Sequence, residues 1–499
     1  MTTLNHKNNL ESFSLYIGAF LLAFLFCLKF SLTTSPLYAI QGDDSAMFYV
    51  IGKSWFKGYL PYVSLWDQKG PLIFLINGLG YLLAGSKLGV FFIQVISLGV
   101  FLVFTYKTFN LYFSSLASAG LSIISLFWLA CSYEGGNLTE EYLLPFSALS
   151  IYLTCCWIDR FESDPLDHNP WNAFLFGFIL GFCFLTRLTN ALVSCGMMAG
   201  IGLLLIIHGR WKNFFMNVLA YLGGFAAIVL PFCAYFAFHG AFEEMLFGTF
   251  IFNVSYLSAS AETSMTSGPV LKSFILFIIL AVNCFGLLFL SAFNFVFDKK
   301  RRARALIWFL ATALLSLWYS NSFLCAHYRT VALPLFPVLF YEVYCLRTRY
   351  PKIISIVLAS CLVLGPLAQT LRKWNSFVDY YNDADLNATV AEYVRETLPP
   401  DGLESFIGYG CSQGVYVLLD VTPCYRNFSF QETMSSRSNR VKEDIIKEFG
   451  SCEAEYILVN GGAPLIKDIL AEHYQPLPPC EAHPSYRIFK KVSNNTDPL

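Results

Sequence analysis

The chain has 499 residues, of which 56% are hydrophobic and 13% are charged, and its formal net charge is −1. Soluble domains carry about 25% charged residues, so this composition excludes an ordinary soluble protein. Because the charge is nearly balanced and no basic face is clustered outside short loops, nucleic-acid binding is not indicated either.

Apolar runs recur along most of the chain, and the majority have the roughly 17 to 25 residues that suit a bilayer-spanning helix. They lie near residues 14–34, 71–84, 88–106, 115–131, 142–158, 171–186, 189–207, 214–238, 273–297, 303–320, 330–346 and 352–370. No small-residue cleavage site follows the first run, so we expect a retained helix rather than a signal peptide. The fold class predicted is a polytopic α-helical membrane protein.

Lysine and arginine are enriched in the cytoplasmic loops of membrane proteins. Here the basic clusters are Lys107, Arg160, Arg210 with Lys212, Lys299 to Arg304, and Arg347, Arg349 with Lys352. All of them can be cytoplasmic only if the run 71–84 does not cross the membrane, and its length of about 21 Å is short of the roughly 30 Å core. We therefore expect a re-entrant or interfacial helix there, about 11 spans, a cytoplasmic N-terminus and an extracytoplasmic C-terminus.

The chain becomes polar after about residue 372, which divides it into a membrane domain, 1–372, and a tail domain, 373–499. The first extracytoplasmic loop of the membrane domain is 35–87. Strands expected near 404–410, 454–460 and 486–490, with helices near 389–396, 442–449 and 463–474, predict a small extracytoplasmic α/β domain. Its cysteines could form two disulfides, in three alternative pairings, or remain buried thiols. They are Cys411, Cys424, Cys452 and Cys480.

Two adjacent carboxylates, Asp43 and Asp44, follow the first apolar run. One of them could cap the helix expected from Ala46 onward. Alternatively, one is a general base, because an apolar wall and a neighbouring carboxylate both raise the pKa of an acid. Either could take the proton; we favour Asp43, with Asp44 capping or orienting.

Cations follow at Lys69, Arg187, His327 and Arg329. Lys69 precedes a helix start, where it would either contact phosphate or extend toward lipid headgroups. Arg187 interrupts an apolar stretch, so it either pairs with an acidic residue or binds phosphate through its guanidinium. His327 is either a structural residue or, beside Arg329, part of a phosphate-contacting pair.

A second acidic pair, Glu140 and Glu141, lies in a short predicted outer loop. It is either a solvated loop or an acceptor-binding or second acidic site. No metal-protease, phosphate-loop or paired-cysteine motif occurs, so neither a zinc site nor a nucleotide-driven motor is supported.

Taken together and in order, these residues resemble the GT-C superfamily of membrane glycosyltransferases. The nearest likeness is to the branch of protein mannosyltransferases and bacterial aminoarabinose transferases, over roughly residues 10–370. The matching residues are Asp43 and Asp44, Gly58 with Pro61 and Tyr62, Asp67 with Lys69, Gly70 and Pro71, Glu140 and Glu141, Arg187, and His327 with Tyr328. Two positions depart from the family pattern: Asp44 stands where Glu is frequent, and Gly70 replaces a proline.

The resemblance implies transfer of a sugar from a polyprenyl-phosphate donor to a glycan, lipid or protein acceptor, with inversion, at the extracytoplasmic face of a bacterial inner membrane. Asp43 would be the base, and Lys69, Arg187, His327 and Arg329 would bind the donor phosphate. No cofactor is expected, and a divalent metal is not indicated. The alternatives are a lipid-linked glycan ligase or polymerase, a lipid transporter, which would predict internal repeats and mid-membrane charges, and a membrane anchor that carries a protein-binding tail.

Overall fold

The computed structural model describes residues 2–38, 42–164, 166–254, 277–279, 281–320, 325–374 and 383–492. The chain divides into two compact units, of which unit 1 comprises Met1–Ser31, Phe91–Tyr235 and Ala261–Phe377, and unit 2 comprises Leu32–Val90, Phe236–Ser260 and Val378–Leu499. Parts of the predicted span 273–297 and of the predicted domain 373–499 lie outside the described residues.

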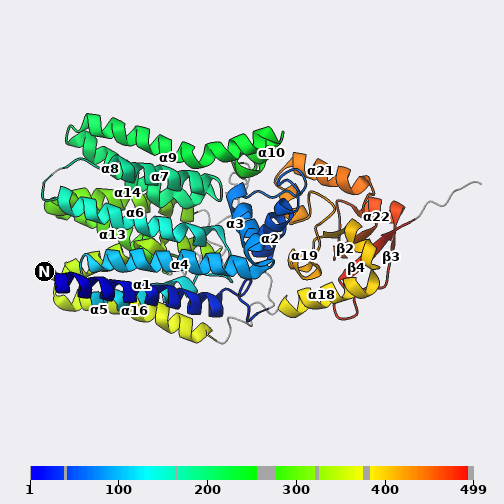
Figure 1. Cartoon of the computed structure of the whole chain (residues 1–499), viewed down its shortest axis with the longest axis horizontal. Coiled ribbons are helices and arrows are strands. Elements are labelled where there is room, and N and C mark those ends of the chain that lie inside the picture. The colour runs from blue at the N-terminus through cyan, green and yellow to red at the C-terminus, as the bar shows by residue number, and fades with distance from the viewer. Residues whose placement is uncertain are drawn as a thin grey trace, which may run out of the picture. The chain divides into compact units, whose positions relative to one another are not determined.

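Unit 1 is built from helices that coincide with the predicted apolar runs (Figure 1). They are α1 (Thr2–Phe30), α4 (Lys87–Asn110), α5 (Ser115–Ala130), α6 (Thr139–Phe161), α7 (Pro170–Phe184), η1 (Leu188–Ala191), α8 (Leu192–Ile207), α9 (Trp211–Phe238), α13 (Val282–Phe297), η3 (Lys299–Arg301), α14 (Arg302–Tyr319), η4 (Ala326–Leu335), α15 (Phe336–Cys345), η5 (Leu346–Thr348) and α16 (Lys352–Lys373). The first residues of α4 and the last of α9 belong to unit 2.

Six helical segments among the described residues are long and apolar enough to cross a membrane, and a seventh is added if α13 and the segment Lys299–Tyr319, which meet at 119°, form one span. Four shorter apolar helices, Ser14–Phe30, Pro71–Ala84, Ser115–Ala130 and Pro170–Phe184, accompany them. The chain is thus an integral membrane protein, whereas the count of about 11 spans stays a prediction.

Small residues set how closely the helices of unit 1 approach. A Cβ atom on Gly177 of α7 would lie 1.8 Å from the carbonyl oxygen of Tyr221, and one on Gly224 of α9 would lie 1.9 Å from that of Phe174. The backbones of α7 and α9 therefore touch, as is usual for membrane helices that associate through glycine. The other side of α9 exposes large apolar side chains such as Leu219 and Leu230, which suits contact with lipid.

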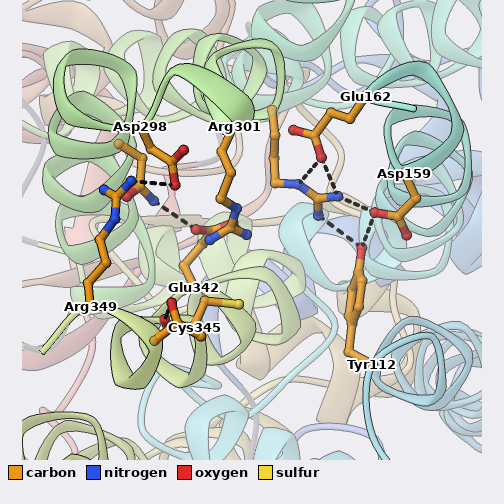
Figure 2. Close-up of polar contacts among 11 residues, drawn as sticks. Tyr112, Asp159, Glu162, Asp298, Arg301, Glu342, Cys345 and Arg349 are labelled. Atoms are coloured by element: carbon orange, nitrogen blue, oxygen red, sulfur yellow. Dashed lines mark hydrogen bonds and ion pairs between the residues drawn. The ribbon is translucent and has the colours of Figure 1, made fainter. Parts of the chain in front are cut away.

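Charged side chains at several helix ends of unit 1 form an ionic network (Figure 2). Arg304, in the first turn of α14, is only 4% exposed. It pairs with Asp159 and with Glu162, the latter at 3.2 Å, and donates a hydrogen bond to the Tyr112 hydroxyl at 3.1 Å. The Tyr112 ring stacks on Tyr341 with a centroid distance of 3.8 Å.

Two further ion pairs extend this network along the same helix ends. Arg301 contacts Glu342 at 2.8 Å, and Arg349 contacts Asp298 at 3.0 Å. The arginines from which cytoplasmic loops were predicted are therefore partly neutralised by carboxylates, although the sidedness itself remains a prediction.

Unit 2 combines short helices with one sheet. Its helices are α2 (Asp43–Phe56), α3 (Pro71–Ala84), α10 (Phe242–Leu246), the π-helix η2 (Phe247–Ile251), α18 (Asp383–Thr397), η6 (Pro400–Ser405), α19 (Gly414–Leu419), α20 (Gln431–Ser435), α21 (Asn439–Gly450) and α22 (Lys467–His473). Its strands are β1 (Phe406–Tyr409), β2 (Tyr456–Asn460), β3 (Tyr474–Pro476) and β4 (Tyr486–Lys491), in the order β1-β2-β4-β3. β1 and β2 are parallel, and the other pairs are antiparallel.

Contacts between distant segments hold unit 2 together. In α2, a Cβ atom on Gly52 would lie 2.4 Å from the carbonyl oxygen of Phe74, so the backbones of α2 and α3 touch. Lys53, buried on α2, forms an ion pair with Asp420 of the tail. The Trp66 amide donates to the Arg426 carbonyl at 2.9 Å. The first loop is thus packed on the tail domain.

The tail cysteines do not pair with one another. Cys411, Cys452 and Cys480 are buried thiols, and Cys424 is exposed. The Cys411 thiol donates to the Leu458 carbonyl oxygen at 3.3 Å. This arrangement corresponds to the alternative of free thiols rather than two disulfides.

Candidate active site

The acidic pair lies in the first turn of α2. Gly42 occupies the N-cap position and makes no side-chain cap bond, so the interpretation in which an aspartate caps this helix is wrong. Asp43 and Asp44 instead lie within the helix, where the positive end of its dipole favours carboxylates. Asp43 is exposed and Asp44 is half-buried.

Asp43 faces a cavity of about 420 Å³ within unit 2. Its Oδ1 accepts a hydrogen bond from the Ser412 hydroxyl at 2.5 Å, which holds the carboxylate against the tail domain. The other lining residues are Gly42, Leu386, Asn387, Gly410, Cys411, Gln413, Phe430, Gln431, Glu432, Thr433, Asn460 and Tyr486.

Asp44 and Lys69 each act on the buried Asp67, to which sequence reasoning gave no separate role. Asp67 is 1% exposed, and its Oδ1 accepts the Lys69 amide hydrogen at 2.9 Å. Burial raises the pKa of Asp67, the positive charge of Lys69 opposes this effect, and the charge of Asp44 adds to it. The Lys69 ammonium lies 5.9 Å from the ring centroid of Phe48, one turn beyond Asp44 on α2. The only sequence signal for Asp67 was its place at the start of the motif that continues through Lys69 to Pro71.

Asp67→Asn is expected to stabilise the protein at neutral pH. The native pKa of Asp67 is raised, so its ionisation weakens the fold increasingly as pH rises above the unfolded value of about 3.9. Asparagine keeps an oxygen for the Lys69 amide and carries no charge. Thermal unfolding between pH 4 and pH 8, a range set by that unfolded value of about 3.9, should show a gain that grows with pH. Exposed Asp401→Asn is the matched control, and an equal gain there would contradict the assignment.

In unit 1, Glu140 and Arg187 form an ion pair. Arg187 Nη1 lies 3.1 Å from Glu140 Oε1, and its guanidinium lies over the Tyr328 ring, 4.0 Å from the centroid. The predicted pairing of Arg187 with an acidic residue is confirmed. Its binding of phosphate stays a prediction.

Both glutamates of the second acidic pair are 2% exposed, so a solvated loop was the wrong interpretation. They begin α6, and Glu141 accepts hydrogen bonds from Tyr133, from Gln94 at 2.9 Å and from the Asn137 amide at 2.8 Å. Glu141 therefore uses both carboxylate oxygens to fix the preceding loop.

That loop presents Glu134, which sequence reasoning missed. Glu134, Gly135, Gly136 and Asn137 have φ values of 43°, 82°, 79° and 58°, so the backbone stays left-handed for four residues. Such strain is concentrated at functional sites. The run of two glycines followed by asparagine was the available signal for an unusual turn.

Glu134 forms an ion pair with His327 and accepts the Ala326 amide hydrogen at 3.0 Å. Burial opposes ionisation of Glu134, but the bond from His327 and the nearby charge of Arg329 hold its pKa below the usual value. Arg329 donates to the carbonyl oxygens of Ala326 and Cys131 at 3.1 and 2.9 Å. His327 and Arg329 thus lie in one polar cluster, as their sequence proximity predicted.

The candidate residues accordingly fall into two groups. Asp43, Asp44 and Lys69 lie in unit 2, and Glu140, Glu141, Arg187, His327 and Arg329 lie in unit 1. Within the described part of the chain, no group of three or more His, Cys, Asp or Glu side chains is arranged to hold a metal ion.

Residues 68–236 match the family model of dolichyl-phosphate-mannose-protein mannosyltransferases. No curated protein sequence matches the chain significantly. The fold is similar to that of the oligosaccharyltransferase of Archaeoglobus fulgidus in its apo form, with a TM-score of 0.51 and 11% identity over 89% of this chain and 69% of that one. ArnT from Cupriavidus metallidurans bound to undecaprenyl phosphate aligns with a TM-score of 0.47 and 12% identity over 96% of this chain and 98% of that one. The predicted resemblance to the GT-C superfamily of polyprenyl-phosphate-dependent membrane glycosyltransferases is confirmed.

Proposed function

We propose that the chain is an inverting glycosyltransferase that moves a sugar from a polyprenyl-phosphate donor to an acceptor hydroxyl, at the extracytoplasmic face of a bacterial inner membrane. The observation that supports this proposal most directly is that the two adjacent aspartates have different surroundings. Asp43 lines a cavity of unit 2, whereas the adjacent Asp44 is half-buried and its charge acts on the buried Asp67.

This difference in surroundings suits a reaction in which the sugar is transferred in one displacement step. The acceptor oxygen attacks the anomeric carbon from the face opposite the phosphate, and the bond from that carbon to the phosphate oxygen breaks. Asp43 takes the acceptor proton, and the electron pair of the broken bond leaves with the polyprenyl phosphate. The anomeric configuration is therefore inverted.

Charge develops on the departing phosphate, and fixed cations stabilise such charge without further reorganisation. We assign this role to Arg187, His327 and Arg329 of unit 1. Glu140 holds Arg187 by an ion pair, and Glu134 holds His327 by a hydrogen bond. We propose that no metal or organic cofactor is required, because these side chains supply the positive charge.

The test is turnover of defined donors by purified protein in proteoliposomes. A panel of undecaprenyl- and dolichyl-phosphate sugars should lose sugar and accumulate free polyprenyl phosphate, and NMR of the product should show the inverted configuration. Movement of intact donor between leaflets, with no free polyprenyl phosphate, would contradict the proposal in favour of a transporter.

Arg187→Gln combined with Glu140→Gln is expected to raise the donor KM by about tenfold or more, the effect of losing a charge-assisted contact with phosphate. The double change is preferable because Arg187→Gln alone would leave the buried Glu140 carboxylate unpaired. Donor-dependence kinetics measure the effect, and exposed Arg160→Gln is the control. An unchanged donor KM would give Arg187 a structural role only.

A further inference from the structure

The cavity beside Asp43 lies at the carboxyl ends of the two parallel strands of unit 2. Gly410, Cys411 and Ser412 directly follow β1, and Asn460 ends β2; all four line the cavity. In open α/β sheets, ligands bind outside the carboxyl ends of the strands. The volume of about 420 Å³ is within the range of about 300–1,000 Å³ typical of small-ligand pockets. Position and size therefore suit a small ligand.

One buried polar atom of the cavity wall has no hydrogen-bond partner. Gln413 is 1% exposed, and its Nε2 donates to the Cys411 carbonyl at 3.2 Å. Its Oε1 is buried and accepts no hydrogen bond from any residue that the structure describes. An unsatisfied buried acceptor is unfavourable, so a ligand that donates a hydrogen bond there would relieve the deficit.

Aromatic residues form another part of the wall. Phe430 has φ = 48°, a conformation that is uncommon for a bulky residue and is found where surrounding structure enforces it, often at ligand clamps. Tyr486 lies directly opposite Asn460 in the β2–β4 ladder. Aromatic rings combined with amide and hydroxyl groups suit a sugar, whose ring has an apolar face and a polar edge.

The charge of the wall disfavours an anionic ligand. The charged lining residues are Asp43 and Glu432, both acidic, and none of the lining residues is a lysine or arginine. A phosphate would be repelled here, so the cavity is unsuited to the donor head group.

We propose that this cavity binds the acceptor as a neutral saccharide and directs one of its hydroxyl groups to the Asp43 carboxylate. The inference rests on the proposed function, to which it adds the acceptor class and a role for the tail domain. Gln413 would accept a hydrogen bond from one sugar hydroxyl, while Phe430 and Tyr486 would contact the ring.

Binding can be measured without turnover. Full-length protein in nanodiscs would be titrated with methyl glycosides of glucose, galactose, mannose and N-acetylglucosamine and with their β-linked disaccharides, observed by saturation-transfer difference NMR. At least one saccharide is expected to bind. Thr433→Trp, which fills the cavity from an exposed position, should weaken that binding at least about tenfold. Ser436→Trp, exposed just beyond α20 and not part of the wall, should leave it unchanged.

Kinetics separate this inference from the proposed function. With a donor that the protein turns over, Thr433→Trp and Gln413→Met should raise the acceptor KM about tenfold, whereas Ser436→Trp should leave it unchanged. Normal acceptor kinetics in both variants, no saccharide binding, or competition only by a serine-containing peptide would overturn the inference. Failure to consume any polyprenyl-phosphate sugar would instead overturn the proposed function, even if saccharides bind.

Discussion

Asparagine in place of Asp43 is expected to lower kcat for glycosyl transfer by about 10² to 10⁴, the usual contribution of a general base. The change is nearly isosteric, so the hydrogen bond from Ser412 to Oδ1 can persist. Because Asp43 is exposed, its neutralisation should have little effect on folding. Steady-state kinetics with saturating donor and acceptor measure the loss.

Asp44→Asn is the informative comparison. Asp44 is half-buried and its charge acts on Asp67 rather than on the cavity, so its neutralisation should lower kcat much less than Asp43→Asn does. Donor binding should survive in Asp43→Asn, as judged by retention of a labelled polyprenyl-phosphate sugar. Wild-type kcat in Asp43→Asn, or a larger kcat loss in Asp44→Asn, would reverse the two assignments.

Arg304→Met is expected to produce the largest loss of stability, about 3–5 kcal/mol of unfolding free energy. Methionine fills a similar volume but leaves Asp159 and Glu162 without their cation at the end of the bundle (Figure 2). Unfolding in mixed detergent micelles, followed by circular dichroism, measures the difference.

Two further variants test whether the loss of stability comes from the unpaired charges. Arg302→Met changes an exposed neighbour and should cost less than about 0.5 kcal/mol. Adding Asp159→Asn and Glu162→Gln to Arg304→Met should recover part of the loss, since it removes the unpaired charges. If Arg304→Met unfolded like the wild type, the network would contribute little to the fold.

Local sequence patterns predicted the helices and strands well where apolar periodicity or a Gly-Pro pair determines the local structure. The apolar runs became helices, α3 begins at Pro71 as the Gly70-Pro71 pair indicated, and the strands expected near 404–410, 454–460 and 486–490 correspond to β1, β2 and β4. The short β3 was missed because Tyr474–Pro476 had been assigned in part to the end of the preceding helix.

The sequence indicated which residues belong to the candidate site, but it did not indicate which of them contact each other. Glu140 looked like part of a solvated loop because its partner, Arg187, is 47 residues away. His327 meets Glu134 across 193 residues, and no local pattern indicates that contact. Asp43 was a plausible N-cap from the sequence, but in the structure Gly42 occupies the N-cap position of α2.

The backbone contact between α2 and α3 has a consequence for how the protein works over a catalytic cycle. Gly52 and Gly78 leave no space for either helix to slide or rotate against the other. The acid that begins α2 and the lysine that precedes α3 must therefore travel as one rigid piece. Under the proposed function, any movement that admits substrates or releases products would occur at hinges outside this pair, so the backbones that carry the proposed proton acceptor and the proposed cation would keep a constant separation throughout the reaction.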